Sequence, residues 1–348
     1  MTAAVNRTPA IDHSGSNVGR RWTNRLGIAA LGLTSVASLL AWVSGLGPFH
    51  VWFGLVTLPG AVALILAGRW AGSPKGLATD PELATAIRLG VVAGLIGTLG
   101  YDLFRVPFIV FGGLRLFAPI ESYGVLALGA DTSSAWTDLA GWAYHVSNGV
   151  GFGVAYAVVA TRRHWAWGVL WAMVLESATV LSPFAQAYSL SGKWGIIAIA
   201  YAAHVPFGLA LGVIVQRADR WDRHLLEISP RSVWWALALT GSGLFLWHSP
   251  LTEDPKVAAG RAVAEGPSAQ ISEGGLSPEW LHVGVGGCAA LHNGDSLRHL
   301  LRVGDLETEV AAGATELLCF DDPGVHRIRT TGEPFDGGFV IVDEGFRR

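Results

Sequence analysis

Charged residues and cysteines are both scarce in this chain. Of its 348 residues only 15% are charged, while 51% are hydrophobic and the mean hydropathy is +0.41. An ordinary soluble domain has about 25% charged residues, so the composition excludes a chain that is soluble throughout. It indicates a polytopic membrane protein. The only two cysteines, Cys288 and Cys319, lie near the C-terminus.

Several motifs of familiar chemistry are missing. The sequence has no Walker phosphate-binding loop, no G-x-G-x-x-G after a soluble strand, no C-x-x-C or C-x-x-C-H and no H-E-x-x-H. Its basic residues line the edges of apolar segments and form no patch on a soluble domain, which argues against a nucleic-acid partner. The motifs therefore assign no catalytic residue.

Seven apolar stretches approach the roughly 17 to 25 residues that a helix needs to cross a bilayer. We expect a membrane bundle of about seven helices over 26–248, after an N-terminal tail of residues 1–25. The stretches are Leu26–Leu46, Phe49–Gly68, Ala84–Gly112, Asp138–Ala160, Trp165–Phe184, Trp194–Val215 and Ser232–His248.

The positions of arginine and lysine predict the orientation. The tail and alternate connections hold 13 basic residues, whereas the opposite connections hold only Arg115 and Lys193. By the positive-inside rule, the N-terminus lies in the cytoplasm and the chain after Pro250 is exported. We therefore expect a multi-pass plasma-membrane protein.

Charge also divides the chain into two parts. Residues 250–348 contain 16 acidic and 8 basic residues, a net charge of −8, while residues 1–249 have a net charge of +5. The range 249–277 is rich in Pro, Gly, Ala, Ser and Glu, which is typical of a flexible linker. We expect a small exported domain over 278–348.

The membrane part contains a repeated pattern. The fourth and sixth spans share H-V-x-x-G-x-x-x-G, which begins at His145 and at His204. Small residues four apart let helix backbones approach closely, so Gly149, Gly153, Gly208 and Gly212 predict helix packing faces. We expect a core of two repeated hairpins over 84–160 and 165–215, as in some proteins built around a central site.

Four ionisable residues lie in four consecutive spans: Asp102, His145, Glu176 and His204. At 1.5 Å per residue, all four fall about 10 to 15 Å below the outer surface. Ionisable groups in hydrocarbon are costly and mark functional sites. Arg105 and Asn148 add polar groups nearby.

Three interpretations of this layer stay open. Two histidines and two carboxylates suit a transition metal, and two histidines on parallel helices also suit haem, although nothing specifies haem. The same groups suit a proton relay, because burial and neighbouring charges shift their pKa values. Structural polar packing is the third interpretation: Asp102 pairs with Arg105, and each histidine bonds a facing helix.

The exported region has the pattern of a small β-sandwich. Short apolar runs alternate with Gly, Asp and Pro turn signals. The expected strands are Trp280–Val285, His299–Val303, Leu306–Val310, Thr315–Phe320, His326–Thr330 and Gly338–Val342.

Part of this region resembles the cupredoxins, the plastocyanin and azurin-like family. The resemblance rests on Asn293-Gly294-Asp295-Ser296-Leu297-Arg298-His299, on Asp322-Pro323-Gly324-Val325-His326 and on Gly338–Val342. It implies that His299 stands at the first copper ligand. Thr330 stands where the family has its cysteine, and Glu333 and Asp336 stand near the remaining ligands. Blue copper is therefore not expected, because that site needs the thiolate. A different metal held by His299, Glu333 and Asp336 and a metal-free sandwich both stay open.

The two cysteines of the exported domain permit a disulfide, since this compartment is oxidising. Two free buried thiols are the alternative. Taken together, the sequence predicts an integral membrane protein whose intramembrane His/carboxylate site handles a metal ion or protons, beneath an exported cupredoxin-like domain. The alternative is a non-catalytic membrane anchor whose outer sandwich binds an exported protein.

Overall fold

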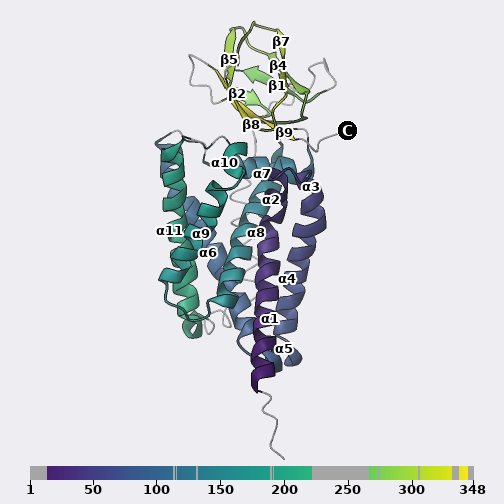
Figure 1. Ribbon diagram of the computed structural model, residues 1–348. Coiled ribbons are helices and arrows are strands. Elements are labelled where there is room, and N and C mark those ends of the chain that lie inside the picture. The colour runs from purple at the N-terminus through teal and green to yellow at the C-terminus, as the bar shows by residue number, and fades with distance from the viewer. Residues whose placement is uncertain are drawn as a thin grey trace, which may run out of the picture.

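The computed structural model describes residues 14–112, 114, 116–130, 132–188, 190, 192–221, 266–272, 275–304, 306–330 and 337–343. A helical bundle is followed by a β-sandwich, which lies over one end of the bundle (Figure 1). The expected seventh span, Ser232–His248, and the first part of the expected linker lie outside the described residues.

Four helical segments in the described part of the chain are long and apolar enough to cross a membrane: Val18–Val43, Phe49–Ala71, Leu83–Val110 and Trp194–Gln216. They match the expected first, second, third and sixth spans. The elements of the bundle are α1 (Ser14–Leu33), η1 (Thr34–Val36), α2 (Ala37–Val43), α3 (Phe49–Trp52), η2 (Phe53–Thr57), α4 (Leu58–Ala71), α5 (Pro74–Thr79), α6 (Leu83–Val110), α7 (Ala118–Leu128), α8 (Ala135–Val159), α9 (Ala166–Val180), α10 (Phe184–Ala187) and α11 (Trp194–Gln216).

The expected fourth and fifth spans form helices of a different character. α8 has 25 residues but is less apolar than the four segments above. It packs against α1, α6 and α7, and this enclosed position accommodates its polar residues. α9 has only 15 residues and ends at Val180, well before the expected end at Phe184. Pro183 cannot donate a helical hydrogen bond, and α10 starts directly after it.

The predicted glycine faces lie at helix contacts. A Cβ atom on Gly153 of α8 would overlap the carbonyl oxygen of Gly90 on α6, and one on Gly208 of α11 would lie 2.6 Å from the carbonyl oxygen of Gly168 on α9. Because glycine has no side chain, α8 packs directly on the α6 backbone and α11 on the α9 backbone. Gly149 and Gly212 belong to the same two contacts.

Helix α7 was not predicted from the sequence. It lies against the first half of α8, where a Cβ atom on Gly124 or Gly141 would overlap a backbone carbonyl of the other helix. Gly129 ends α7 with a φ of +59°, a left-handed conformation that favours glycine. Eight of the eleven α7 residues are buried, so this short helix fills the end of the bundle beneath the sandwich.

The sandwich has nine described strands in two sheets. Their bounds are β1 (Ser268–Ser272), β2 (Gly275–Ser277), β3 (Trp280–Gly284), β4 (Gly287–Asn293), β5 (His299–Val303), β6 (Leu306–Val310), β7 (Thr315–Phe320), β8 (Gly324–Thr330) and β9 (Gly338–Asp343). The orders are β2-β1-β4-β7 and β3-β9-β8-β5-β6. β1 and β2 lie within 249–277, the range expected to be a linker, because β1 pairs in parallel with β4 and completes the smaller sheet.

Cys288 and Cys319 form a disulfide in the smaller sheet. They lie opposite each other on the antiparallel strands β4 and β7, with their Cα atoms 4.0 Å apart. The disulfide therefore ties together the sheet that lies farther from the bundle (Figure 1).

Strand β9 is buried on both faces. Val340 and Val342 belong to the core between the two sheets, whereas Phe339 and Ile341 pack on the bundle. Successive strand residues point to opposite faces, so a strand that is apolar throughout suits a position between two cores. Trp280 and Val325 join the second core from β3 and β8, and the bundle contributes residues of α2, α3, α7, α8 and α10.

Hydrogen bonds also join the sandwich to the bundle. The connection between α7 and α8 runs along the edge strand β3, where the Ser133 N–H donates to the Trp280 carbonyl at 2.9 Å. The Trp280 Nε1–H donates to Glu121 of α7 at 3.1 Å, and His282 Nδ1 lies 3.0 Å from the Ala130 carbonyl oxygen. The bundle thus covers a sheet edge that would otherwise be open to pairing.

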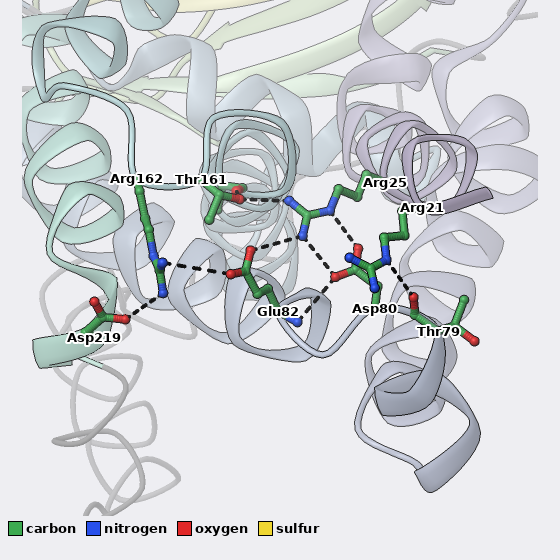
Figure 2. A network of polar contacts seen from close by, with 9 residues as sticks. Arg21, Arg25, Thr79, Asp80, Glu82, Thr161, Arg162 and Asp219 are labelled. Carbon is green, nitrogen blue, oxygen red and sulfur yellow. Dashed lines mark hydrogen bonds and ion pairs between the residues drawn. The ribbon is translucent and has the colours of Figure 1, made fainter. Parts of the chain in front are cut away.

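The opposite end of the bundle is held by a charged network, which Figure 2 shows. Arg25 of α1 donates two hydrogen bonds to Asp80, at 2.7 and 3.0 Å, and a third to the Thr161 hydroxyl at 3.1 Å. Asp80 is almost completely buried. Burial acts to raise the pKa of Asp80, but the hydrogen bonds and charge of Arg25 outweigh it and lower the pKa.

Replacing Asp80 by asparagine is expected to destabilise the protein by about 1.5 to 3 kcal/mol, because the partly buried Arg25 would lose its two charged hydrogen bonds and keep only the more exposed Glu82, at 3.5 Å. The measurement is unfolding of purified protein in detergent. The matched control is Asp219→Asn, which removes the exposed partner of Arg162 in the same network and is expected to cost less than about 1 kcal/mol. Equal effects of the two changes would contradict this account of the Arg25–Asp80 pair.

Candidate functional site

The four ionisable residues of the predicted layer come from four different helices. Asp102 lies on α6, His145 on α8, Glu176 on α9 and His204 on α11. Asp102 and His145 form one pair, and Glu176 and His204 form another. Their side chains are between 7% and 16% exposed, so both pairs lie largely inside the bundle.

The first pair includes an arginine. His145 Nε2 lies 3.0 Å from Asp102 Oδ1 and 3.2 Å from Oδ2. Arg105, one turn further along α6, donates to the same carboxylate and also to the Leu116 carbonyl at 2.9 Å. The Asp102 charge is therefore balanced by Arg105 when His145 is neutral, which makes a buried carboxylate tolerable here.

The second pair is looser. His204 Nδ1 lies 3.4 Å from Glu176 Oε2 and 2.9 Å from the Ala200 carbonyl oxygen of its own helix. The shorter contact fixes the His204 ring and indicates that Nδ1 carries a proton. Glu176 is only 5% exposed, so it lies beside the histidine within the contact between α9 and α11.

Tyr101 connects the two pairs and was not predicted from the sequence. Its ring centroid lies 4.7 Å from that of His204 and 6.0 Å from that of His145. The Arg105 guanidinium lies 4.2 Å from the same ring centroid, within the range of a cation–π contact. Tyr101 precedes Asp102 and is four residues before Arg105, a helical spacing that was the available signal.

Aromatic rings close the first pair on its other sides. The Trp142 ring centroid lies 5.8 Å from that of His145, and the Arg105 guanidinium lies 4.7 Å from the Phe117 centroid. Asn148, which was expected nearby, belongs to neither pair: it is buried on α8 beside Tyr144. Aromatic rings therefore surround the first pair, and the Asn148 amide does not take part in it.

A metal centre made from all four predicted residues does not form in this arrangement. Among the residues that the structure describes, no group of three or more His, Cys, Asp or Glu side chains is placed to hold a metal ion. Haem ligation by both histidines also fits poorly. His145 Nε2, the nitrogen that would face the iron, is bonded to Asp102, and the Tyr101 ring contacts both imidazoles.

The candidate metal site of the sandwich is a turn in this structure. His299 Nε2 lies 2.6 Å from Asp295 Oδ2, and Asp295 Oδ1 accepts from the Leu297 N–H at 2.8 Å. The Asn293 amide donates to the carbonyls of Leu297 and Val310. The motif that carries the resemblance thus organises the loop between β4 and β5. Glu333 and Asp336 lie outside the described residues.

Blue copper does not fit the residues of this domain. The site requires a cysteine thiolate, and both cysteines of the chain are joined in the disulfide. His299, at the first ligand position, is already held by Asp295.

No protein-family model matches the chain, and no curated protein matches it. Among solved structures, a purple cupredoxin from Nitrosopumilus maritimus is similar with 21% identity over 22% of this chain and 99% of its own, at a TM-score of 0.21. A variant of amicyanin in its reduced Cu(I) form has 22% identity over 25% of this chain and 88% of its own, at a TM-score of 0.22. A copper-containing nitrite reductase from Thermus scotoductus has 21% identity over 26% and 27%, at 0.20.

Each of these matches covers about a quarter of this chain, the size of one domain. TM-scores this low do not establish a common overall fold. The two-sheet order described above is what defines the sandwich.

Asp102→Asn is expected to destabilise the protein by about 3 to 5 kcal/mol, because Arg105 would be left buried without its carboxylate. Glu176→Gln is the matched comparison and is expected to cost about 1 kcal/mol, since His204 stays satisfied by Ala200 when neutral. Thermal unfolding in detergent measures both changes. A larger loss for Glu176→Gln would contradict the assignment of Asp102 as the counterion of Arg105.

Asp295 predicts an acid-sensitive step in the sandwich. The hydrogen bond from His299 lowers the pKa of Asp295 below its ordinary value. A lowered carboxyl pKa gives stability that is complete above the ordinary value, near 3.9, and is lost as pH falls through the folded-state pKa. The protection of β5 and β6 amides, measured as the ratio of the intrinsic to the observed exchange rate at each pH, is therefore expected to fall below about pH 4. The loss of protection should be smaller in Asp295→Asn and unchanged in Asp322→Asn, which alters an exposed aspartate of the same domain.

Proposed function

We propose that this chain is an integral membrane protein whose bundle accepts and releases protons at the two His–carboxylate pairs, beneath a docked cupredoxin-like domain. The observation that carries the proposal is the 3.0 Å contact between His145 Nε2 and Asp102, held by Arg105 within the bundle. Ionisable residues inside a membrane bundle typically serve ion or proton pathways.

The chemistry of the first pair suits proton exchange. A histidine and a carboxylate within hydrogen-bond distance exchange a proton without a change in backbone position. Arg105 donates to the Asp102 carboxylate and balances its charge, and we propose that the His145 imidazole is the group that passes the proton on. Tyr101 lies between this pair and His204, and we propose that protons move between the two pairs along this face of α6.

The interpretation as a metal site has less support. It needs at least three ligands around one point, and the described residues offer two separate pairs. The repeated glycine contacts support the two-hairpin core, since α6 with α8 and α9 with α11 each place a histidine beside a carboxylate. We propose that these hairpins are structural equivalents, that the N-terminus is cytoplasmic and that the sandwich is exported, as the distribution of basic residues predicts.

Proton flux into liposomes tests the proposal. Purified protein is reconstituted in vesicles that contain a pH-sensitive dye, and an imposed pH gradient is allowed to collapse. We expect faster collapse than in protein-free vesicles and a loss of most of the added rate, about tenfold, in a His145→Gln/His204→Gln double variant. Asp102 is left in place, so that Arg105 keeps its counterion and the bundle keeps its fold.

The control is Ser147→Ala on the same helix, because the Ser147 hydroxyl donates to the Tyr144 carbonyl of its own helix and to no other group among the described residues. It should conduct like the unaltered protein. Equal rates in protein-free vesicles and in vesicles with folded protein would overturn the proposal and favour an anchor whose sandwich binds an exported partner. Elemental analysis of the same preparation after loading with first-row metals tests the metal interpretation directly.

A further inference from the structure

A groove runs along the contact between α8 and α9, apart from both His–carboxylate pairs. Its volume is about 430 Å³. Its lining residues are Tyr156, Val159, Ala160 and Arg163 from the end of α8 and the following turn, and Trp167, Leu170, Trp171 and Val174 from α9. On both sides the lining residues recur at intervals of three or four over seven residues. On its α9 side the groove therefore follows the helix for about 10 Å, and on its other side it runs from the last turn of α8 into the connection between the helices.

The groove opens on the outer surface of the bundle. Trp167, Leu170 and Val174 are each at least half exposed, although they are large and apolar. On a helix of a membrane bundle, such a surface contacts lipid. A groove with apolar walls at this surface has the lining that an acyl chain needs.

One end of the groove carries a positive charge. Arg163 lies in the turn between α8 and α9, is exposed, and has no ion pair among the residues that the structure describes. Its neighbour Arg162 differs, because it pairs with Asp219 at 2.8 Å in the network of Figure 2. The groove thus has apolar walls and one arginine without an ion pair among the described residues, at the end of the bundle opposite the sandwich.

Two hydrogen-bond donors lie buried in the groove wall. The Tyr156 hydroxyl and the Trp171 Nε1 have no hydrogen-bond partner within the described part of the chain, and their ring centroids lie 6.2 Å apart. Tyr156 is only 2% exposed. Buried donors normally have a partner. Tyr156 lies on the last turn of α8, and Arg163 lies in the turn that follows this helix.

We propose that this groove binds an anionic phospholipid, with its phosphate on Arg163 and one acyl chain along Trp167, Leu170 and Val174. The charge at the groove end selects the ligand. Basic pockets between membrane helices bind anionic headgroups, and each basic residue near the surface contributes about fivefold in affinity for them. The apolar lining alone would hold any acyl chain, so the selectivity resides in Arg163.

Native mass spectrometry of the full chain in detergent tests this site. The protein is incubated with phosphatidylglycerol or phosphatidylcholine that carry identical acyl chains, and retained lipid is counted at increasing collision energy. We expect the unaltered protein to retain phosphatidylglycerol about fivefold more than phosphatidylcholine. Arg163→Gln should retain the two lipids equally, and Val174→Trp, which fills the groove, should retain less of both.

The matched control is Arg20→Gln, which removes an exposed arginine of α1 that does not line the groove. It should keep the preference of the unaltered protein. The proposal is overturned if folded protein retains no lipid, if it retains the two lipids equally, or if Arg163→Gln keeps the preference. A preference that falls equally in Arg20→Gln and Arg163→Gln would also overturn it, because it would reflect total charge. None of these outcomes depends on proton flux.

Discussion

The burial of β9 between two hydrophobic cores is the constraint on which the arrangement of the whole molecule depends. One set of its side chains closes the sandwich, and the alternate set, Phe339 and Ile341, closes the end of the bundle. Full burial of one such side chain contributes about 1.5 to 3 kcal/mol. Neither part can leave the other without exposing apolar surface, so the sandwich has a fixed position over the helices.

The same contact decides what surrounds the ionisable residues of the bundle. α7 supports the sandwich from below and packs on α8 through Gly124 and Gly141, which places Phe117 and Leu116 at its start beside Arg105. The arginine that balances Asp102 is thus held by the segment that supports the sandwich. Docking of the outer domain and the electrostatics of the first pair are linked through about a dozen residues of one short helix.

Much of the fold followed from sequence patterns because those patterns reflect local physics. Apolar length predicted four helices that are long and apolar enough to cross a membrane, and five of the expected strands, including His299–Val303, begin and end within one residue of the observed bounds. β1, β2 and β4 were not among the expected strands. β2 pairs with β1, and β1 pairs with β4, contacts that depend on tertiary structure. α7 was not predicted for a different reason: its eleven residues are too few to indicate a membrane span.

The candidate site shows a similar division. Equal depth suggested that Asp102 and His145 lie close enough to interact, since helix rise fixes depth, and in the structure His145 Nε2 lies 3.0 Å from Asp102 Oδ1. The direction in which each side chain points depends on the rotation of its helix, however, and helix packing sets that rotation. The glycine contacts pack α6 on α8 and α9 on α11, so the four residues form two separate pairs. Tyr101 was missed because an aromatic residue in an apolar span gives no distinct signal. The continuous apolar run Phe339–Val342 was a usable signal for a strand covered on both faces, and its implication for docking was not drawn.

The edge of the sandwich is completed by a segment that is synthesised long before it. The Ser133 backbone N–H bonds Trp280, a residue 147 positions later. Domains generally fold in the order of synthesis, so the helical part is in place when β3 emerges. The bundle then offers an apolar surface for β9 to pack on and the backbone of Ser133 for β3 to bond. In this protein the membrane domain serves as an assembly template for the domain above it.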